Sequence, residues 1–214
     1  MNHIKCYSCS IVIKSKLCLI KNTIINDNKM PILYTNNINL IIPKNNFLTA
    51  EHIYPQSLLK DCENKDMHNI IKTFNTLNVN RSNYKYCDIY DLTDKNWFKL
   101  EYDNYVNHKK KLFIPNINSR GFISRAILYM CREYNLDFNN IIDKSTLIRW
   151  FYNYSPTSRE LYHNDIVKNI QNKNNIFISS YNKKNSYIKR YIAFSRDRLS
   201  VARAARASNS SRGR

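Results

Sequence analysis

The sequence has no long apolar run. The stretch near its start contains Ile11 to Ile13 and Leu17 to Ile20, but Lys14 and Lys16 interrupt it. These runs are too short and too broken for the core of a secretory signal or for a membrane span. We therefore expect an intracellular protein with no membrane partner, and we expect its six cysteines to be mainly reduced thiols.

Acidic residues are also scarce. Sixteen Asp and Glu residues stand against 34 Lys and Arg residues, which gives a formal charge of +18 and a pI of about 9.7. That balance is typical of proteins that bind nucleic-acid phosphates, although an ordinary basic globular protein can share it. Sixteen tyrosines add aromatic rings that can stack on bases or sugars.

Glycine is the third scarcity, with two residues in 214, and it accompanies an excess of Asn, Ile, Lys and Tyr. The codons of these four residues are rich in A and T. This indicates an AT-biased genome, such as that of a parasite, an organelle or a large virus, so an organelle or a virion stays open as the location. The same bias weakens any argument that rests on a single Asn or Lys.

Length and a hydrophobic fraction of 43% fit one packed domain of average size with extensions. We divide the chain into an N-terminal extension over 1–46, a domain over 47–180 and a tail over 181–214. The tail contains ten Lys or Arg residues and one acid, Asp197. We expect a disordered arm that binds nucleic acid, and the alternatives are a passive solvated terminus or a cloning remnant.

The N-terminal extension contains a candidate zinc site. Cys6 and Cys9 form a Cys-x-x-Cys pair, and Cys18 and His3 lie nearby in the sequence. Thiolates and imidazoles at such spacing can hold Zn²⁺. No second close pair accompanies them, so unliganded thiols packed on a small hairpin are the alternative.

Apolar spacing and turn residues predict the other elements. Short strands are expected at 24–25, 32–34 and 38–42, a longer strand at 47–53, an extended piece at 66–71, and helices at 72–83, 119–130, 144–152 and 157–170. Ser119 and Thr157 are expected helix caps. In the last helix, Leu161, Ile170 and either Ile166 or Val167 are expected to be buried.

Three short blocks carry the residues of a hydrolytic site. The first begins with Glu51-His52, the second is Asp66-Met67-His68-Asn69, and the third runs from Asn78 to Tyr84. A histidine near its ordinary pKa can take a proton from water, and a carboxylate with a neutral amide can hold a divalent cation. This set is what one-metal hydrolysis of a phosphodiester needs.

The order and spacing of these blocks resemble the bacterial endonuclease I family of non-specific nucleases, a branch of the ββα-metal (His-Me finger) superfamily. The resemblance implies an α+β fold, with a ββα-metal core and a helical C-terminal half. It implies that His52 is the general base and that Glu51 and Asn78 bind one Mg²⁺. Asn80 or Asn83 would replace Asn78 if the register shifted.

The second half of the chain extends the resemblance. Residues 120–130 resemble the family's KGDxARAxxYM helix, and residues 160–164 and 171–178 resemble its E-x-x-R-N and QGNxNPF blocks with substitutions in both. The resemblance covers about residues 48–178.

Three further positions bear on the site. Asn64 stands where the family often has a Glu, and Glu63 could serve if the loop is shifted. Because a planar guanidinium binds phosphate well, Arg81 is a candidate contact to the scissile or a neighbouring phosphate, with a plain surface cation as the alternative. Asn69 is expected to tie the loop between the two β pieces through hydrogen bonds to the backbone.

The leading hypothesis is a Mg²⁺-dependent, largely sequence-non-specific endonuclease acting on DNA or RNA. The alternative is an inactive, nuclease-derived protein that binds nucleic acid inside a large particle such as a ribosome or virion. The lack of an export signal, the Asn64 departure and the basic tail favour the alternative. The retained Glu51, His52 and Asn78 favour the nuclease, because a pure scaffold has no need of them.

Overall fold

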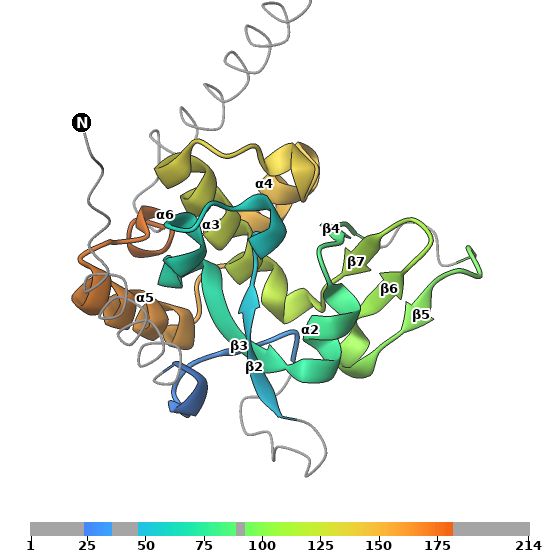
Figure 1. Cartoon of the computed structure of the whole chain (residues 1–214), viewed down its shortest axis with the longest axis horizontal. Coiled ribbons are helices and arrows are strands. Elements are labelled where there is room, and N and C mark those ends of the chain that lie inside the picture. Colours follow the sequence, from blue (N-terminus) through green and yellow to red (C-terminus); the bar gives the residue numbers. More distant parts are fainter. Residues whose placement is uncertain (1–23, 36–46, 89–92, 182–214) are drawn as a thin grey trace, which may run out of the picture. The chain divides into compact units, whose positions relative to one another are not determined.

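The computed structural model of the chain describes residues 24–35, 47–88 and 93–181 (Figure 1). The chain divides into two units, Met1–Ser179 and Ser180–Arg214. Within the described ranges, strands dominate the N-terminal part and helices the C-terminal part, so the fold is mixed α+β, as predicted.

The strands are β1 (Ile32–Leu33), β2 (Leu48–His52), β3 (Ile70–Phe74), β4 (Lys85–Tyr86), β5 (Phe98–Lys99), β6 (Tyr105–Asn107) and β7 (Leu112–Ile114). The α-helices are α2 (Asn75–Arg81), α3 (Ile117–Tyr134), α4 (Lys144–Asn153), α5 (Ser158–Gln171) and α6 (Ile176–Ser179). The 3-10 helices are η1 (Gln56–Leu58), η2 (Glu63–Lys65), η3 (Met67–Asn69), η4 (Glu101–Asp103) and η5 (Phe138–Asn140).

Two strands and a helix form the frame of the predicted site. β2 and β3 pair antiparallel, with Glu51 opposite Ile71 and His52 opposite Ile70. β3 then runs directly into α2, which lies against both strands (Figure 1). The chain therefore follows a strand-strand-helix order over the three sequence blocks.

The helix predicted from residue 72 begins later, at Asn75. Lys72 and Thr73 belong instead to β3, where they pair with β2, and the Thr73 hydroxyl donates to the carbonyl of Leu33. Pairing on both sides of β3 overrides the helical spacing of the apolar residues, since a central strand satisfies its backbone groups on both edges.

The extended piece predicted at 66–71 is wrong in its first half. Residues 67–69 form η3, and the Asp66 carboxylate caps this turn by accepting a hydrogen bond from the His68 N–H. A short acidic side chain that bonds the backbone two residues ahead favours such a turn over a strand.

Residues 24–35 are part of the same fold. β1 runs parallel to β3, with Ile32 opposite Lys72, and the sheet order is β1-β3-β2. The strand predicted at Ile24–Ile25 is wrong, because residues 24–26 are helical. The boundary predicted at residue 47 therefore falls inside a sheet.

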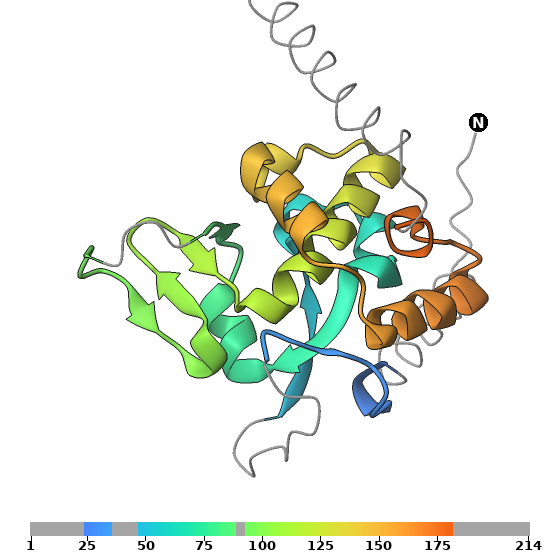
Figure 2. The same ribbon diagram turned by 180° about the vertical axis from the view of Figure 1, so that it is seen from behind.

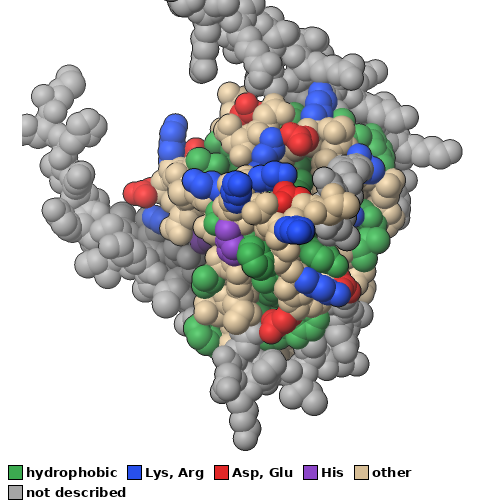
Figure 3. Space-filling model, turned by 90° about the vertical axis from the view of Figure 1, so that its right-hand side faces the viewer, with side chains coloured by type: hydrophobic (Ala, Val, Ile, Leu, Met, Phe, Trp, Pro, Cys, Tyr) green, Lys and Arg blue, Asp and Glu red, His purple; other side chains and the backbone are tan. Residues whose placement is uncertain are grey.

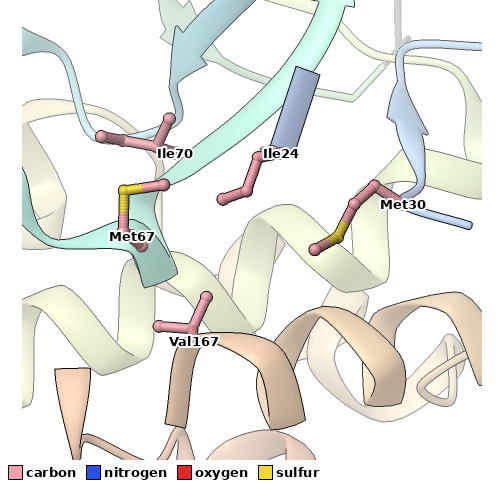
Figure 4. Close-up of a cluster of buried hydrophobic side chains, with 5 residues drawn as sticks. All are labelled: Ile24, Met30, Met67, Ile70 and Val167. Carbon is pink, nitrogen blue, oxygen red and sulfur yellow. The ribbon is translucent and has the colours of Figure 1, made fainter. Parts of the chain in front are cut away.

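Apolar side chains hold this N-terminal segment in place. Figure 4 shows that Ile24 and Met30 cluster with three side chains from other elements. These are Met67 from η3, Ile70 from β3 and Val167 from α5. All five are buried, with at most 1% of each residue exposed. The segment thus completes a core to which both halves of the domain contribute.

The region between the two halves forms a second sheet that the sequence pattern did not predict. Its strand order is β4-β7-β6-β5, with β4 parallel to β7 and the other two pairs antiparallel (Figure 2). Each strand has only two or three residues. Such strands are too short to show a periodic alternation of apolar and polar residues.

The helical half begins differently from the prediction. Asn116, not Ser119, caps α3, because its side chain accepts the Ser119 N–H. The Ser119 hydroxyl accepts instead the backbone N–H of Tyr34, which joins α3 to the end of β1. At α5 the prediction holds, since the Thr157 hydroxyl accepts the N–H of Glu160.

The buried face of α5 is more polar than predicted. Val167 is buried, but Leu161 is 43% exposed and Ile170 is 37% exposed, so the prediction is wrong for both. Glu160 and His163 occupy the buried face instead. Specific partners for these polar groups therefore fix this helix together with the apolar contacts of Val167.

Glu160 forms a buried ion pair with α3. Arg125 donates from Nε and Nη2 to the two Glu160 carboxylate oxygens, each at 2.6 Å. A Cβ atom added to Gly121 would lie 2.7 Å from both the Arg125 guanidinium and the carbonyl of Tyr154. Gly121 therefore leaves the room that this bidentate pair requires.

Several predictions concern residues outside the described ranges. These are the zinc site at Cys6, Cys9 and Cys18, the strand at 38–42, and the tail from residue 182 onward. Within the described ranges, no helix is long and apolar enough to cross a membrane.

His163 is a buried titratable group at the centre of the helical half. Its Nε2 donates to the carbonyl of Ile70 at 3.2 Å. Burial, with the nearby His68 adding to it, lowers the pKa of His163 to about 3. The folded protein therefore keeps this ring neutral at pH values where an unfolded chain protonates it.

We predict that His163→Gln flattens the acid limb of the stability curve. Because the folded pKa lies below the unfolded value of about 6.5, the stability contributed by neutral His163 is complete above that value and is lost as the pH falls. Relative to the variant, the wild type should lose about 2 kcal/mol between pH 7 and pH 5, measured by urea unfolding. His108→Gln, at an exposed histidine, is the matched control. Parallel pH curves for wild type and His163→Gln would contradict the assignment.

Candidate active site

His52 ends β2 and is half-buried. Its Nε2 lies 3.1 Å from the carbonyl oxygen of Asn64 in η2. A carbonyl can only accept, so Nε2 carries the proton in this bond and Nδ1 is the unprotonated nitrogen of the neutral ring. The backbone thus selects the tautomer in which Nδ1 can accept a proton.

Glu51, one residue earlier, points into the protein. It is 2% exposed, and its Oε1 accepts the Tyr34 hydroxyl at 2.8 Å and lies 3.3 Å from Arg81 Nε. Burial raises the pKa of Glu51, while the Arg81 charge and the Tyr34 hydroxyl act in the opposite direction. Adjacent strand residues face opposite ways, so Glu51 and His52 reach the end of β2 from its two sides.

Arg81 does not lie where a phosphate contact would need it. The residue is 1% exposed, and its Nη atoms donate to the carbonyls of His52, Ile53 and Ser82. Its guanidinium also lies 4.6 Å from the centre of the Tyr86 ring. The predicted phosphate contact is therefore corrected: Arg81 is a positioning residue that holds Glu51 and the end of β2.

Two tyrosines complete this buried group, and the sequence did not single them out. The Tyr34 and Tyr86 hydroxyls lie 2.7 Å apart, and Tyr34 donates onward to Glu51. Burial raises the pKa of both hydroxyls, so both stay protonated and can donate. With sixteen tyrosines in the chain, no local pattern marks these two.

Asn78 lies on α2 beside the strand that carries Glu51. Its Nδ2 donates to the Thr49 hydroxyl at 3.0 Å and to the Ala50 carbonyl at 3.3 Å. Both amide hydrogens are therefore used on β2, which leaves Oδ1 as the atom that can bind a cation. The amide is thus fixed next to the peptide that precedes Glu51.

One carboxylate and one amide oxygen fit Mg²⁺, which prefers oxygen ligands and keeps several waters. Among the described residues, no group of three or more His, Cys, Asp or Glu side chains could hold a metal. Glu51 and Asn78 are a different kind of donor set, with one carboxylate and one neutral amide oxygen. The donor chemistry therefore suits a hydrated hard cation better than zinc.

The loop that faces His52 is held by its own side chains. Glu63 is buried, and its Oε2 accepts the N–H of Lys60 at 2.8 Å. Asn64 meets His52 through its backbone carbonyl, while its buried Oδ1 has no bond to a described residue. As expected, Asn69 ties the loop: it accepts the Tyr54 N–H and donates to the Tyr54 carbonyl.

We predict that Arg81→Met destabilises the protein by about 3–5 kcal/mol, because it leaves the buried Glu51 carboxylate without its ion pair. Lys85→Met is the matched control: Lys85 pairs with Asp143 at the surface, so its loss should cost at most about 1 kcal/mol. Adding Glu51→Gln to Arg81→Met should recover part of the loss. Urea unfolding measures all three. Equal costs for Arg81→Met and Lys85→Met would refute the buried pair.

Comparison with known proteins identifies the family of this chain. The family described as Endonuclease I matches residues 15–181, which include both sheets and all the helices described above. A curated protein named Endonuclease-1, from Buchnera aphidicola subsp. Baizongia pistaciae (strain Bp), is 27% identical over 124 residues. The match covers 56% of this chain and 49% of the relative, so the chain spans about half the length of that curated relative. Because the family match extends over most of the sequence, the chain belongs to the endonuclease I family.

Proposed function

We propose that this protein is a Mg²⁺-dependent endonuclease that hydrolyses nucleic-acid phosphodiesters with little sequence preference. The observation that carries the proposal is the bond between His52 Nε2 and the Asn64 carbonyl, which assigns the proton of the neutral ring to Nε2 and makes Nδ1 the basic nitrogen. Membership of the endonuclease I family supports the reaction class. The net charge of +18 supports binding through the phosphate backbone, which favours DNA or RNA of any sequence.

In this proposal His52 is the general base. Nδ1 accepts the proton of the attacking water, and the Asn64 carbonyl keeps the ring oriented and stabilises the imidazolium through the Nε2 hydrogen. The water oxygen bonds to phosphorus as the P–O3′ bond breaks, and the departing 3′-oxygen takes a proton from solvent, so the products carry a 5′-phosphate and a 3′-hydroxyl. Arg81 acts indirectly, by holding the carbonyl of His52 and the carboxylate of Glu51.

Glu51 and Asn78 would hold the cation from β2 and α2. Bound there, Mg²⁺ would supply Lewis-acid stabilisation of the negative charge on the phosphate and the departing oxygen. Asn78 contributes a neutral oxygen, so the ion would keep most of its charge for the substrate. Tyr34 and Arg81 fix the Glu51 carboxylate, which limits the reorganisation needed to bind an ion.

We predict that His52→Ala lowers the cleavage rate by at least about 10²-fold and leaves nucleic-acid affinity nearly unchanged, because the base acts only in the chemical step. Plasmid nicking with Mg²⁺ measures the cleavage rate, and filter binding in EDTA measures the nucleic-acid affinity. Gln56→Ala, in the exposed turn after β2, is the control and should cut like the wild type. Unimpaired nicking by His52→Ala would show that another group is the base.

We predict that Asn78→Ala raises the Mg²⁺ concentration required for half-maximal cleavage, because it removes one oxygen ligand. Asn80→Ala is a matched control two residues along α2, where the Asn80 amide donates to the Thr76 carbonyl. Cleavage should be titrated with Mg²⁺ for both variants. A normal requirement for Asn78→Ala and a raised one for Asn80→Ala would transfer the ligand to Asn80.

The alternative function is that of an inactive, nuclease-derived component of a nucleoprotein particle, in an organelle, a virion or elsewhere inside a cell. One observation favours it: the Glu51 carboxylate is already buried in an ion pair. The same assays distinguish the two functions. Wild-type protein that binds nucleic acid and never cuts it, at any Mg²⁺ concentration, would establish the alternative.

A further inference from the structure

Three rings meet at one end of the second sheet: Tyr84, Phe98 and His108. Tyr84 precedes β4, Phe98 begins β5, and His108 follows β6. The register places these positions at the same end, because Phe98 lies opposite Val106 and the start of β4 lies beside the start of β7. We call these three residues the ring cluster.

The rings contact one another while remaining open to solvent. The ring centre of His108 lies 5.7 Å from that of Tyr84 and 5.9 Å from that of Phe98. The Tyr84 hydroxyl and His108 Nδ1 lie 3.2 Å apart, which fixes the central ring. Phe98 is 56% exposed and His108 is also exposed. A single exposed apolar residue is ordinary, but a pre-arranged group of rings at the surface is not.

Lysines form the turn beside these rings. Residues 109–111 join β6 to β7, and all three are exposed. Lys110 pairs with Asp94, whereas neither Lys109 nor Lys111 has an acidic partner among the described residues. Figure 3 views the molecule from the side of this sheet and shows Lys and Arg side chains around histidine and hydrophobic side chains. This combination of exposed rings and free cations suits a partner with flat rings and negative charges.

The ring cluster is connected to the candidate active site through β4. The N–H of Tyr84 donates to the carbonyl of Arg81, the last residue of α2. Two residues further, the Tyr86 hydroxyl contacts Tyr34 and the carbonyl of Ile53. The same short segment therefore supports the end of β2 and carries one ring of the cluster.

We propose that the ring cluster stacks unpaired bases of the substrate strand while Lys109 and Lys111 bind the flanking phosphates. Paired bases are stacked on their neighbours and hide their faces, so the cluster would favour single-stranded segments. Ring stacking tolerates every base, which agrees with slight sequence preference. This inference rests on the proposed function, because it takes nucleic acid as the substrate.

Binding of the full chain to two oligonucleotides of equal length tests the inference, with EDTA present to prevent cleavage. One is a labelled twelve-nucleotide thymidylate and the other an abasic strand with the same phosphates. Phe98→Leu keeps an apolar side chain and removes the ring. It should weaken thymidylate binding roughly 5- to 100-fold and leave abasic binding unchanged. Phe98→Tyr should restore binding. The matched control is Tyr152→Leu on α4, where Tyr152 is 46% exposed.

The lysines give a second, independent readout. The double variant Lys109→Gln and Lys111→Gln should weaken binding of both oligonucleotides and reduce the dependence of affinity on salt, because fewer counterions are released. Lys168→Gln, on the exposed side of α5, is its control. A uridylate strand of the same length repeats the experiment with RNA, and a blunt duplex should respond less to Phe98→Leu than either single strand.

The outcomes separate this inference from the proposed function. Equal thymidylate affinities of Phe98→Leu, Tyr152→Leu and the wild type, while the wild type still cuts plasmid with Mg²⁺, would overturn the ring cluster and leave the nuclease standing. Wild-type protein that binds no oligonucleotide and cuts nothing would overturn both. Equal losses on thymidylate and abasic strands for Phe98→Leu would also overturn stacking, since bases would then contribute nothing.

Discussion

The buried carboxylate of Glu51 is the constraint on which the site depends. A carboxylate removed from water is costly unless an opposite charge and hydrogen bonds replace the lost hydration. Here Arg81 supplies the charge and Tyr34 the hydrogen bond. These partners come from α2 and from the segment just after β1, so satisfying one carboxylate requires three parts of the chain to come together at the end of β2.

The same requirement fixes the residues around Glu51. Arg81 reaches the carboxylate and also donates to the carbonyls of His52 and Ile53, so the peptide groups at the end of β2 cannot move independently of α2. The amide of Asn78 adds two more bonds from α2 to β2. The proposed base and the proposed cation ligand belong to different elements and are therefore held in one frame, which is the preorganisation that a hydrolytic site needs.

The sequence predicted the parts of this site that depend on adjacency. Glu51 and His52 are neighbours, and their strand was recognisable from its apolar pattern. The role of Arg81 was not predictable in the same way, because residue type and position say nothing about whether a guanidinium faces solvent or a buried acid. Tyr34 was missed because it is 17 residues from Glu51 and one tyrosine among sixteen.

The fold shows a similar division. The helices α4 and α5 were predicted closely because each has a long enough apolar or capping pattern. The start of α2 was misplaced because Lys72 and Thr73 form a central strand only once β1 and β2 lie on both sides of them. Leu161 was expected to be buried because apolar residues usually are, but the Arg125–Glu160 pair turns the polar side of α5 inward.

The helical half has its own part in the site, although none of its residues is proposed to touch substrate. Asp66, at the start of η3, accepts the hydroxyls of Tyr129 and Tyr134 from α3. Gln171, at the end of α5, accepts the N–H of Met67 and donates to the carbonyl of Lys65. These bonds attach residues 65–67, which follow Asn64 in the loop between β2 and β3, to both α3 and α5.

That loop carries the Asn64 carbonyl, which fixes the tautomer of His52. The substitutions that separate the C-terminal blocks from the family pattern leave Gln171 in place, and Gln171 makes both bonds to the loop. The second half thus supplies a support for the proposed base rather than a second set of reacting groups. The tautomer of His52 is thus held through a support that begins more than a hundred residues away in the sequence.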